Sequence, residues 1–140
     1  MTKKKNSSRT LADSPADCPC GTARPYAACC GRYHDGAAAP DAESLMRSRY
    51  SAYVRGLAPY LLQTWHASTR PPSVALSSAT VWLGLKVLGY DCAEPDRAWV
   101  EFVARGRESG ASAFRLHERS RFAREDDGRW YYVDGEFPQA

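Results

Sequence analysis

The sequence has no hydrophobic run long enough to span a membrane, and residues 1–16 lack the apolar stretch of about 7 to 15 residues that a signal peptide needs. Those sixteen residues instead hold three lysines followed by Ser, Thr, Asp and Pro, and we expect them to form a disordered tail. These absences predict a cytoplasmic protein with no membrane span. Cysteines in that compartment are more often reduced metal ligands than disulfides.

A strong excess of charge of one sign is also missing. The formal net charge is +3, because residues 1–36 carry six basic and three acidic side chains while the rest of the chain is balanced. Nucleic-acid binding needs a clustered basic face that neutralises phosphates, so we expect no nucleic-acid partner beyond a weak contact of the lysine tail with RNA. A chain of 140 residues, 44% of them hydrophobic, suffices for one domain with its own core plus a small appendage.

Common catalytic motifs are absent. The sequence contains no nucleophile elbow, no phosphate-binding loop, no second metal cluster and no paired carboxylate motif. This favours a binding protein, with an enzyme as the alternative.

Four of the five cysteines lie within thirteen residues, in the pattern C-x-C, eight residues, C-C: Cys18, Cys20, Cys29 and Cys30. Four thiolates from two short loops can surround a tetrahedral Zn²⁺ at about 2.3 Å from each sulfur, and so small a segment has no other core. Disulfides are the alternative, but bridging either close pair would close a strained ring, which leaves only cross-pairing. The spacing therefore favours a structural zinc ion, with no open coordination position for catalysis.

This stretch resembles the SEC-C module at the C-terminal tail of the bacterial translocase motor SecA, through the residues Cys18, Pro19, Cys20, Gly21, Tyr26, Cys29, Cys30 and Gly31. Thr22 and Ala23 stand where the module usually has Ser-Gly, and His34 is a reserve ligand at best. The resemblance implies a zinc-binding module, at residues 17–36, that docks a protein partner. Side chains near the metal that could anchor such a partner are Arg24, Tyr26, Arg32 and Tyr33.

The segment from Asp41 to Leu57 is predicted to be the helix on which the rest of the chain packs. Asp41 can cap its first turn, and Gly56 can end it in a left-handed conformation. The helical period gathers an apolar face made of Leu45, Met46, Tyr50, Tyr53, Val54 and Leu57. Arg49 falls near the middle of that face, which is unusual for a solvated side chain. A second, shorter helix is expected after Pro59.

Beyond residue 79 the pattern changes to that of β-strands. Strands are predicted at 80–88, 97–105, 111–124 and 130–133, with turns at 94–96, 106–110 and 126–128. Helices followed by an antiparallel meander of about four strands form an α+β layout, with the helices on one face of the sheet.

The alternation of the third strand places Glu118 on the same face as Leu116 and Phe122. We expect Glu118 to contact Arg49 as a buried pair, because either charge alone would be costly to desolvate. The alternative is a polar cavity in which Glu118 or His66 acts as a base. His117 falls on the arginine-rich face and is expected to be solvated.

Four further stretches, LMRSRYSAY at 45–53, TWHASTRP at 64–71, LHERSRF at 116–122 and WYYVDG at 130–135, resemble the uncharacterised bacterial YchJ family. This resemblance covers nearly the whole chain after Asp17. It implies a SEC-C module joined to a domain, at residues 37–140, similar to nuclear transport factor 2 (NTF2). In such domains helices cover a strongly bent antiparallel sheet and form a cone, and cones of this kind host enzymes, ligand binders and plain scaffolds.

The main functional expectation is a zinc-binding adaptor that docks a protein through the zinc-binding module, or knuckle, at residues 17–36. The alternative is an enzyme or ligand binder that holds a small molecule in the cone. The residues expected to line that pocket are Arg49, Tyr50, Tyr53, Trp65, His66, Trp82 and Glu118.

Overall fold

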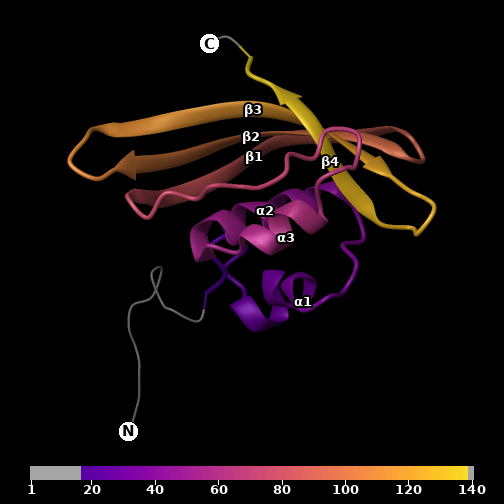
Figure 1. The fold of residues 1–140 in the computed structure, drawn as a ribbon, viewed down its shortest axis with the longest axis horizontal. Coiled ribbons are helices and arrows are strands. Elements are labelled where there is room, and N and C mark those ends of the chain that lie inside the picture. The colour runs from indigo at the N-terminus through magenta and orange to yellow at the C-terminus, as the bar shows by residue number, and fades with distance from the viewer. Residues whose placement is uncertain (1–16, 139–140) are drawn as a thin grey trace, which may run out of the picture.

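The computed structural model describes residues 17–138, so the predicted disordered tail at 1–16 lies outside the described residues. A short 3-10 turn, η2 (Tyr26–Ala28), and helix α1 (Cys30–His34) form the N-terminal knuckle. Two further helices follow, α2 (Ala42–Arg55) and α3 (Ala58–Gln63). The remaining elements are the strands β1 (Thr80–Glu94), β2 (Arg97–Glu108), β3 (Ala113–Arg124) and β4 (Trp130–Glu136). Figure 1 shows α2 and α3 between the sheet and the knuckle.

Helix α2 begins and ends where its sequence predicts. The Asp41 carboxylate accepts a hydrogen bond from the backbone N–H of Ser44 at 2.7 Å and so caps the first turn. Gly56 has φ 74°, the left-handed conformation that ends many helices. The predicted apolar face is confirmed for Leu45, Met46 and Tyr50, which are buried. Val54 was placed on that face as well but is 38% exposed.

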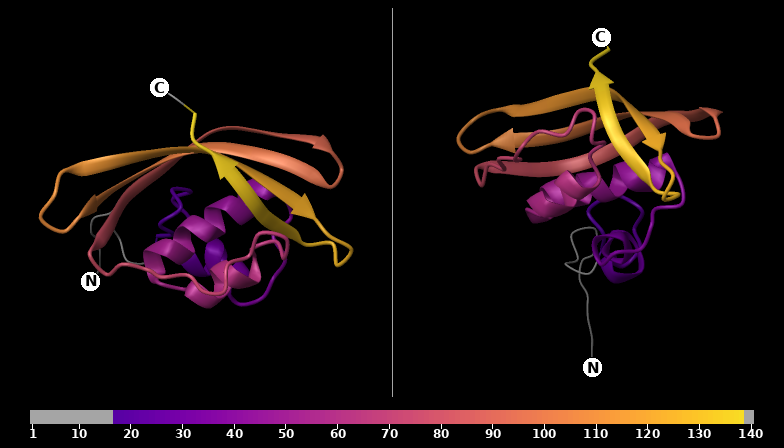
Figure 2. Two further views of the ribbon diagram at one scale, coloured as in Figure 1. Left: turned by 45° about the horizontal axis from the view of Figure 1, so that its top comes forward. Right: turned by 45° about the vertical axis from the view of Figure 1, so that its right-hand side comes forward.

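All four strands predicted from the sequence are present, in one antiparallel sheet of order β1-β2-β3-β4. Figure 2 shows that the sheet bends over the helices, which cover its concave face. Register shifts in β1 opposite β2, and one between β3 and β4, contribute to the bend, because a bulge increases local twist. The predicted α+β cone is therefore confirmed.

One turn begins later than predicted. Gly106 remains in β2, paired with Phe114 of β3. A Cβ atom at Gly106 would lie 2.7 Å from the Phe114 ring, so the absence of a side chain lets that ring cross the strand. Glycine here serves close packing instead of a turn, which starts only after Glu108.

The main core lies between the helices and the concave face of the sheet. Its central members are Leu45, Met46, Tyr50, Val100, Phe102, Ala104 and Phe122. Phe122 belongs to the strand face that period-2 alternation predicts. The segment after α3 adds to the sheet, since the backbone N–H of His66 donates to Tyr132 O and Tyr132 N–H donates to Thr64 O. Among the described residues no helix is long and apolar enough to cross a membrane.

Candidate functional site

The four clustered cysteines converge in the knuckle. An isolated bridge between Asp17 and Pro25 closes the loop that carries Cys18 and Cys20, while the segment from η2 to α1 supplies the other two. All four sulfurs lie within 4.8 Å of one another, and no cysteine side chain of the cluster is more than 4% exposed. The local fold thus gathers four soft ligands around one point.

This arrangement fits a tetrahedral metal ion. Sulfurs at about 2.3 Å from a common zinc ion are about 3.8 Å apart, and the Cys20 and Cys29 sulfurs are 3.6 Å apart. All four are free thiols, so the disulfide alternative is not realised. Contacts with the Cys20 and Cys30 sulfurs lower the pKa of the Cys18 thiol, whereas the contact with Cys18 raises the pKa of Cys30. Thiols this close cannot all ionise unless a cation balances them.

The turn between the two cysteine pairs contains Thr22 and Ala23, the two residues that depart from Ser-Gly. Ala23 has φ 63°, the left-handed region that favours glycine. Thr22 places its hydroxyl 3.1 Å from the Cys29 sulfur. His34, the reserve ligand, is not part of the sulfur cluster and hydrogen-bonds instead to Tyr26 and to Ser48 O.

We expect Ala23→Gly to raise the free energy of unfolding by up to about 1 kcal/mol. A left-handed residue with a Cβ atom is strained by roughly 1–2 kcal/mol, and this gain exceeds the extra backbone entropy of glycine in the unfolded chain. Urea denaturation of the metal-loaded protein measures the change. The matched control is Ala27→Gly, which should destabilise because Ala27 is exposed and has a negative φ. Equal losses in both variants would contradict the strain at Ala23.

The knuckle is docked on the face of α2 that points away from the sheet. Arg47 donates from Nη1 to Cys20 O at 2.7 Å, and the Ser51 hydroxyl lies 3.4 Å from the Cys18 sulfur. His34 Nε2 lies 2.9 Å from Ser48 O. Both serines are fully buried, so small polar residues allow the knuckle to approach the helix closely. Sequence reasoning missed this face; its signal was the spacing of Arg47 and Ser51, four residues apart on one side of α2.

The residues expected to anchor a docking partner mostly contact other residues of the same chain. Tyr33 is buried in the main core, and its ring lies 4.9 Å from the Arg32 guanidinium. Arg32 also donates to Cys29 O, and Arg24 reaches the Cys29 sulfur at 3.8 Å. Tyr26 lies beneath the guanidinium of Arg55, at 3.9 Å.

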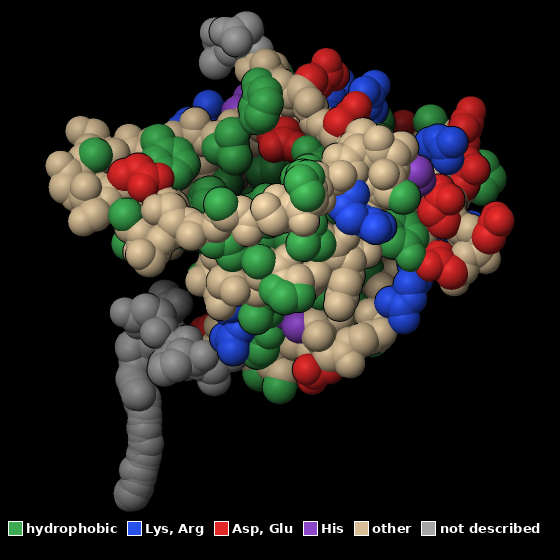
Figure 3. All heavy atoms as spheres, viewed as in Figure 1, with side chains coloured by type: hydrophobic (Ala, Val, Ile, Leu, Met, Phe, Trp, Pro, Cys, Tyr) green, Lys and Arg blue, Asp and Glu red, His purple; other side chains and the backbone are tan. Residues whose placement is uncertain are grey.

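A cavity of about 250 Å³ lies between α2 and the concave face of the sheet. Its lining is mainly apolar and aromatic and comprises Met46, Arg49, Tyr50, Tyr53, Trp65, Trp82, Phe102, Ala104, Leu116, Glu118, Ser120, Phe122 and Tyr132. Figure 3 shows hydrophobic side chains gathered between the sheet and the helices on one face of the molecule. The structure thus brings six of the seven sequence-named pocket residues to one cavity, and His66 is the exception.

Arg49 is the most deeply buried charge at this cavity, with 6% of the residue exposed. Its Nη1 donates to Leu61 O at 2.8 Å and to Thr64 Oγ1 at 2.7 Å. The guanidinium also lies over the rings of Trp65 and Tyr132, at 5.1 and 4.6 Å from their centroids. Burial lowers the pKa of Arg49. The side chain is held in place by carbonyl, hydroxyl and ring partners.

Glu118 reaches the same cavity from β3. Its Oε2 accepts hydrogen bonds from the Ser120 hydroxyl at 2.8 Å and the Tyr132 hydroxyl at 3.1 Å. Burial, followed by the charge of Glu118, raises the pKa of Tyr132, which therefore stays a donor at neutral pH. Gly135 of β4 faces this carboxylate so closely that a Cβ atom there would lie 2.2 Å from Oε2. The sequence carried no signal for Tyr132 or Gly135, because both enter the site only when β4 pairs with β3.

The predicted direct contact between Arg49 and Glu118 is wrong. The ion pairs found among residues 17–138 have a nitrogen and an oxygen within 4.0 Å of each other, and Arg49 and Glu118 do not form one of them. Each charge has its own partners, because α3 and the segment after it offer Arg49 a carbonyl and a hydroxyl at closer range. The two charges instead line one cavity from different elements.

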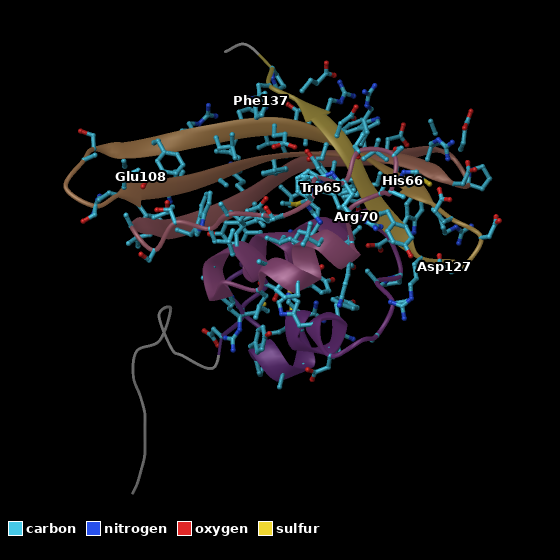
Figure 4. All side chains as sticks on the ribbon, in the orientation of Figure 1. Trp65, His66, Arg70, Glu108, Asp127 and Phe137 are labelled. Atoms are coloured by element: carbon cyan, nitrogen blue, oxygen red, sulfur yellow. The ribbon has the colours of Figure 1, made fainter. Side chains whose placement is uncertain are left out.

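Two histidines also lie elsewhere than expected. His66 Nε2 is 2.8 Å from Glu125 Oε2. Figure 4 shows His66 on the side of the β3–β4 turn, where Asp127 lies, whereas Trp65 lies beneath the sheet. Pairing of the backbone with β4 makes the two neighbours point in opposite directions. The His117 side chain is only 19% exposed and its Nε2 lies 2.7 Å from Glu101 Oε2, so it is a half-buried, hydrogen-bonded residue instead of a solvated one.

A bent antiparallel sheet covered by helices, with a four-cysteine knuckle on the far side of the first long helix, defines an α+β protein that joins a SEC-C motif to an NTF2-like domain. Comparison with known proteins agrees with this class. The family model described as the YchJ middle NTF2-like domain matches residues 41–135, and the SEC-C motif matches residues 16–32. The chain belongs to the YchJ family, as the sequence resemblance indicates.

Similar proteins include several that are named UPF0225 proteins. A UPF0225 protein of Xanthomonas campestris pv. campestris is 58% identical over 124 residues, which are 86% of this chain and 95% of the relative. A UPF0225 protein of Bordetella pertussis is 56% identical, over 95% of this chain and 98% of its own length. The solution structure of a SEC-C motif containing protein from Rhodopseudomonas palustris matches with a TM-score of 0.76 at 33% identity, covering 88% of this chain and 99% of that one.

Proposed function

We propose that this protein binds a small molecule in the cavity beneath its sheet, and that a structural zinc ion holds the knuckle against α2. The observation that carries the ligand-binding role is Arg49, a buried cation with no carboxylate partner among residues 17–138. It lies at the wall of a cavity lined mainly by apolar and aromatic side chains. Buried charges are normally paired, and a binding site combines apolar walls with a few polar groups that fix orientation.

Zinc is the proposed metal because four cysteine sulfurs form a closed tetrahedral set, typical of structural zinc. The ion would be held by Cys18, Cys20, Cys29 and Cys30 and would link the two loops of a segment whose buried cluster consists of these cysteines alone. A thiolate site of this kind is stable in a reducing compartment, which supports a cytoplasmic location. The ranges of the two family models support a division into a knuckle at 17–36 and a cone at 37–140.

Docking of a protein partner through the knuckle stays a prediction. The side chains expected to serve it contact other parts of the same chain. Catalysis in the cavity would rely on Glu118, since His66 lies outside it. We therefore assign the cavity to binding.

Toluene is a suitable probe of the cavity, because dry or partly apolar cavities of this size accept small aromatic molecules. We expect saturable binding of toluene to the zinc-loaded protein, followed by ligand-observed NMR. Leu116→Trp should weaken binding by about tenfold or more, since the larger ring occupies the cavity. The control is Leu88→Trp, at a position that is 46% exposed on β1. Equal binding by both variants would place toluene elsewhere.

A further inference from the structure

Two opposite charges at the cavity, Arg49 and Glu118, keep hydrogen-bonding atoms unused. Arg49 satisfies Nη1 with Leu61 O and Thr64 Oγ1, while its Nε and Nη2 have no hydrogen-bond acceptor within the described part of the chain. Glu118 uses Oε2 for Ser120 and Tyr132, and its Oε1 has no donor among residues 17–138. The cavity therefore keeps one edge of a guanidinium and one carboxylate oxygen free for a ligand.

These two groups sit on different elements and do not contact each other. Arg49 comes from α2 and is held against Trp65, whereas Glu118 comes from β3 and is held by Tyr132. Gly135 leaves the space that the Glu118 carboxylate occupies. Tyr132 contacts both charges, with its ring 4.6 Å from the Arg49 guanidinium and its hydroxyl donating to Glu118. Leu116 and Phe102 add apolar lining to the same cavity.

The charge balance of the cavity selects against ions of a single sign. A simple anion would be attracted by the Arg49 guanidinium but repelled by the nearby Glu118 carboxylate in a poorly solvated space. A simple cation would be attracted by Glu118 but repelled by Arg49. A neutral apolar molecule would fill the walls but leave both charges without a direct partner. Only a molecule that presents an acceptor and a donor at separate points satisfies both groups.

Resting on the ligand-binding role proposed above, we propose that the ligand is a small zwitterion of the amino-acid type, with a carboxylate, an amine and an apolar or aromatic body. Its carboxylate accepts two hydrogen bonds from Nε and Nη2 of Arg49, the parallel geometry that guanidinium and carboxylate groups favour. Its ammonium group donates to Oε1 of Glu118. Its body packs against the aromatic walls, which include Trp82 and Tyr53.

Three probes of matched shape test the assignment by isothermal titration calorimetry on the zinc-loaded full chain. L-phenylalanine carries both charges, 3-phenylpropanoate lacks the amine, and 2-phenylethylamine lacks the carboxylate. We expect L-phenylalanine to bind at least about tenfold more tightly than either partial analogue, since each analogue leaves one buried charge unpaired. The aliphatic set L-leucine, 4-methylpentanoate and 3-methylbutylamine repeats the comparison with a smaller body.

Variants then assign each end of the ligand. Glu118→Gln should lower the affinity for L-phenylalanine to that for 3-phenylpropanoate, and Glu136→Gln, on the exposed end of β4, should leave it unchanged. Arg49→Met should lower the affinity for L-phenylalanine to the affinity for 2-phenylethylamine. The control Arg115→Met, at an exposed position, should leave the affinity for L-phenylalanine unchanged. If circular dichroism shows that Arg49→Met does not fold, Glu118→Gln and the ranking of the probes on the unmodified protein still decide the matter.

The outcomes separate this inference from the proposed function. Binding of toluene without a preference for either zwitterion would overturn the zwitterion assignment and leave the cavity a binding site. Tighter binding of 3-phenylpropanoate or 2-phenylethylamine than of L-phenylalanine would also overturn it. Failure of every probe, toluene included, would overturn both the assignment and the ligand-binding role, and Arg49 and Glu118 would then be a solvent-separated structural pair.

Discussion

Purified protein is expected to contain one zinc ion per chain, and Cys20→Ser is expected to lose it. The fully buried Cys20 sulfur lies 3.6 Å from that of Cys29, so its loss removes one of four ligands at the centre of the site. Structural zinc in small thiolate sites contributes about 10–16 kcal/mol of binding free energy at neutral pH, which is the largest single contribution expected in this protein. Elemental analysis after gel filtration measures the stoichiometry.

The matched control is Cys92→Ser, because Cys92 is exposed on β1 and stands outside the sulfur cluster. This variant should keep its zinc. Retention of a full equivalent by Cys20→Ser, or less than a tenth of an equivalent in the unmodified protein under reducing conditions, would refute the four-cysteine site.

Loss of zinc is expected to unfold the knuckle while the cone remains folded but less stable. The main core contains only one residue of the knuckle, Tyr33, so most of its apolar contacts do not depend on the metal. The cone should nevertheless lose the contacts that Arg47 and Ser51 make with the two cysteine loops. Far-UV circular dichroism with and without a chelator should show a retained sheet with a lowered melting temperature. A single cooperative collapse on chelation would mean that the knuckle and the cone fold as one unit.

Arg49→Met is expected to destabilise the cone by roughly 3 kcal/mol, the second largest effect. The substitution removes the closer of the two side-chain donors to the Leu61 carbonyl and removes a cation from the rings of Trp65 and Tyr132. Glu118→Leu should cost less, about 1 kcal/mol, because Glu118 is half-buried and its hydroxyl partners can turn into the cavity. Urea denaturation of the zinc-loaded variants measures both changes.

The double variant distinguishes two separate charges from an ion pair. Because the side chains are more than 4.0 Å apart, we expect the two losses to add, with a coupling energy below about 1 kcal/mol. A double variant nearly as stable as the unmodified protein would instead show that removal of both charges relieves a buried pair. Arg115→Met serves as the control and should change stability by less than about 0.5 kcal/mol, since Arg115 is exposed.

The knuckle and the cavity share helix α2, which has two functional faces. Arg47 and Ser51 contact the cysteine loops, whereas Arg49, Tyr50 and Tyr53 line the cavity. Residues one or two positions apart on a helix point in different directions, so one helix can carry the cysteine knuckle on one side and line the cavity on the other. The cysteine knuckle therefore packs against the element that positions Arg49, although it lies outside the cavity.

The sequence alone determined the features that depend on near neighbours. Asp41 and Gly56 marked the ends of α2, because caps act within one helical turn. Period-2 alternation assigned Leu116, Glu118 and Phe122 to one face of the third strand, which is the inner face of the sheet. The spacing of four cysteines indicated the cluster. The motifs also sufficed to predict the family and the NTF2-like fold, which the family models confirm.

Only the tertiary structure decided which groups meet. Periodicity placed Arg49 and Glu118 on apolar faces, but it could not tell which acceptors a buried arginine would reach. The acceptors that it reaches are Leu61 O in α3 and Thr64 Oγ1 at the end of α3. His66 was turned away from the cavity by backbone pairing with Tyr132, a residue 66 positions further along the chain. Such choices depend on competition between groups that are distant in sequence, because burial makes each polar group take the partner that packing brings within hydrogen-bond distance.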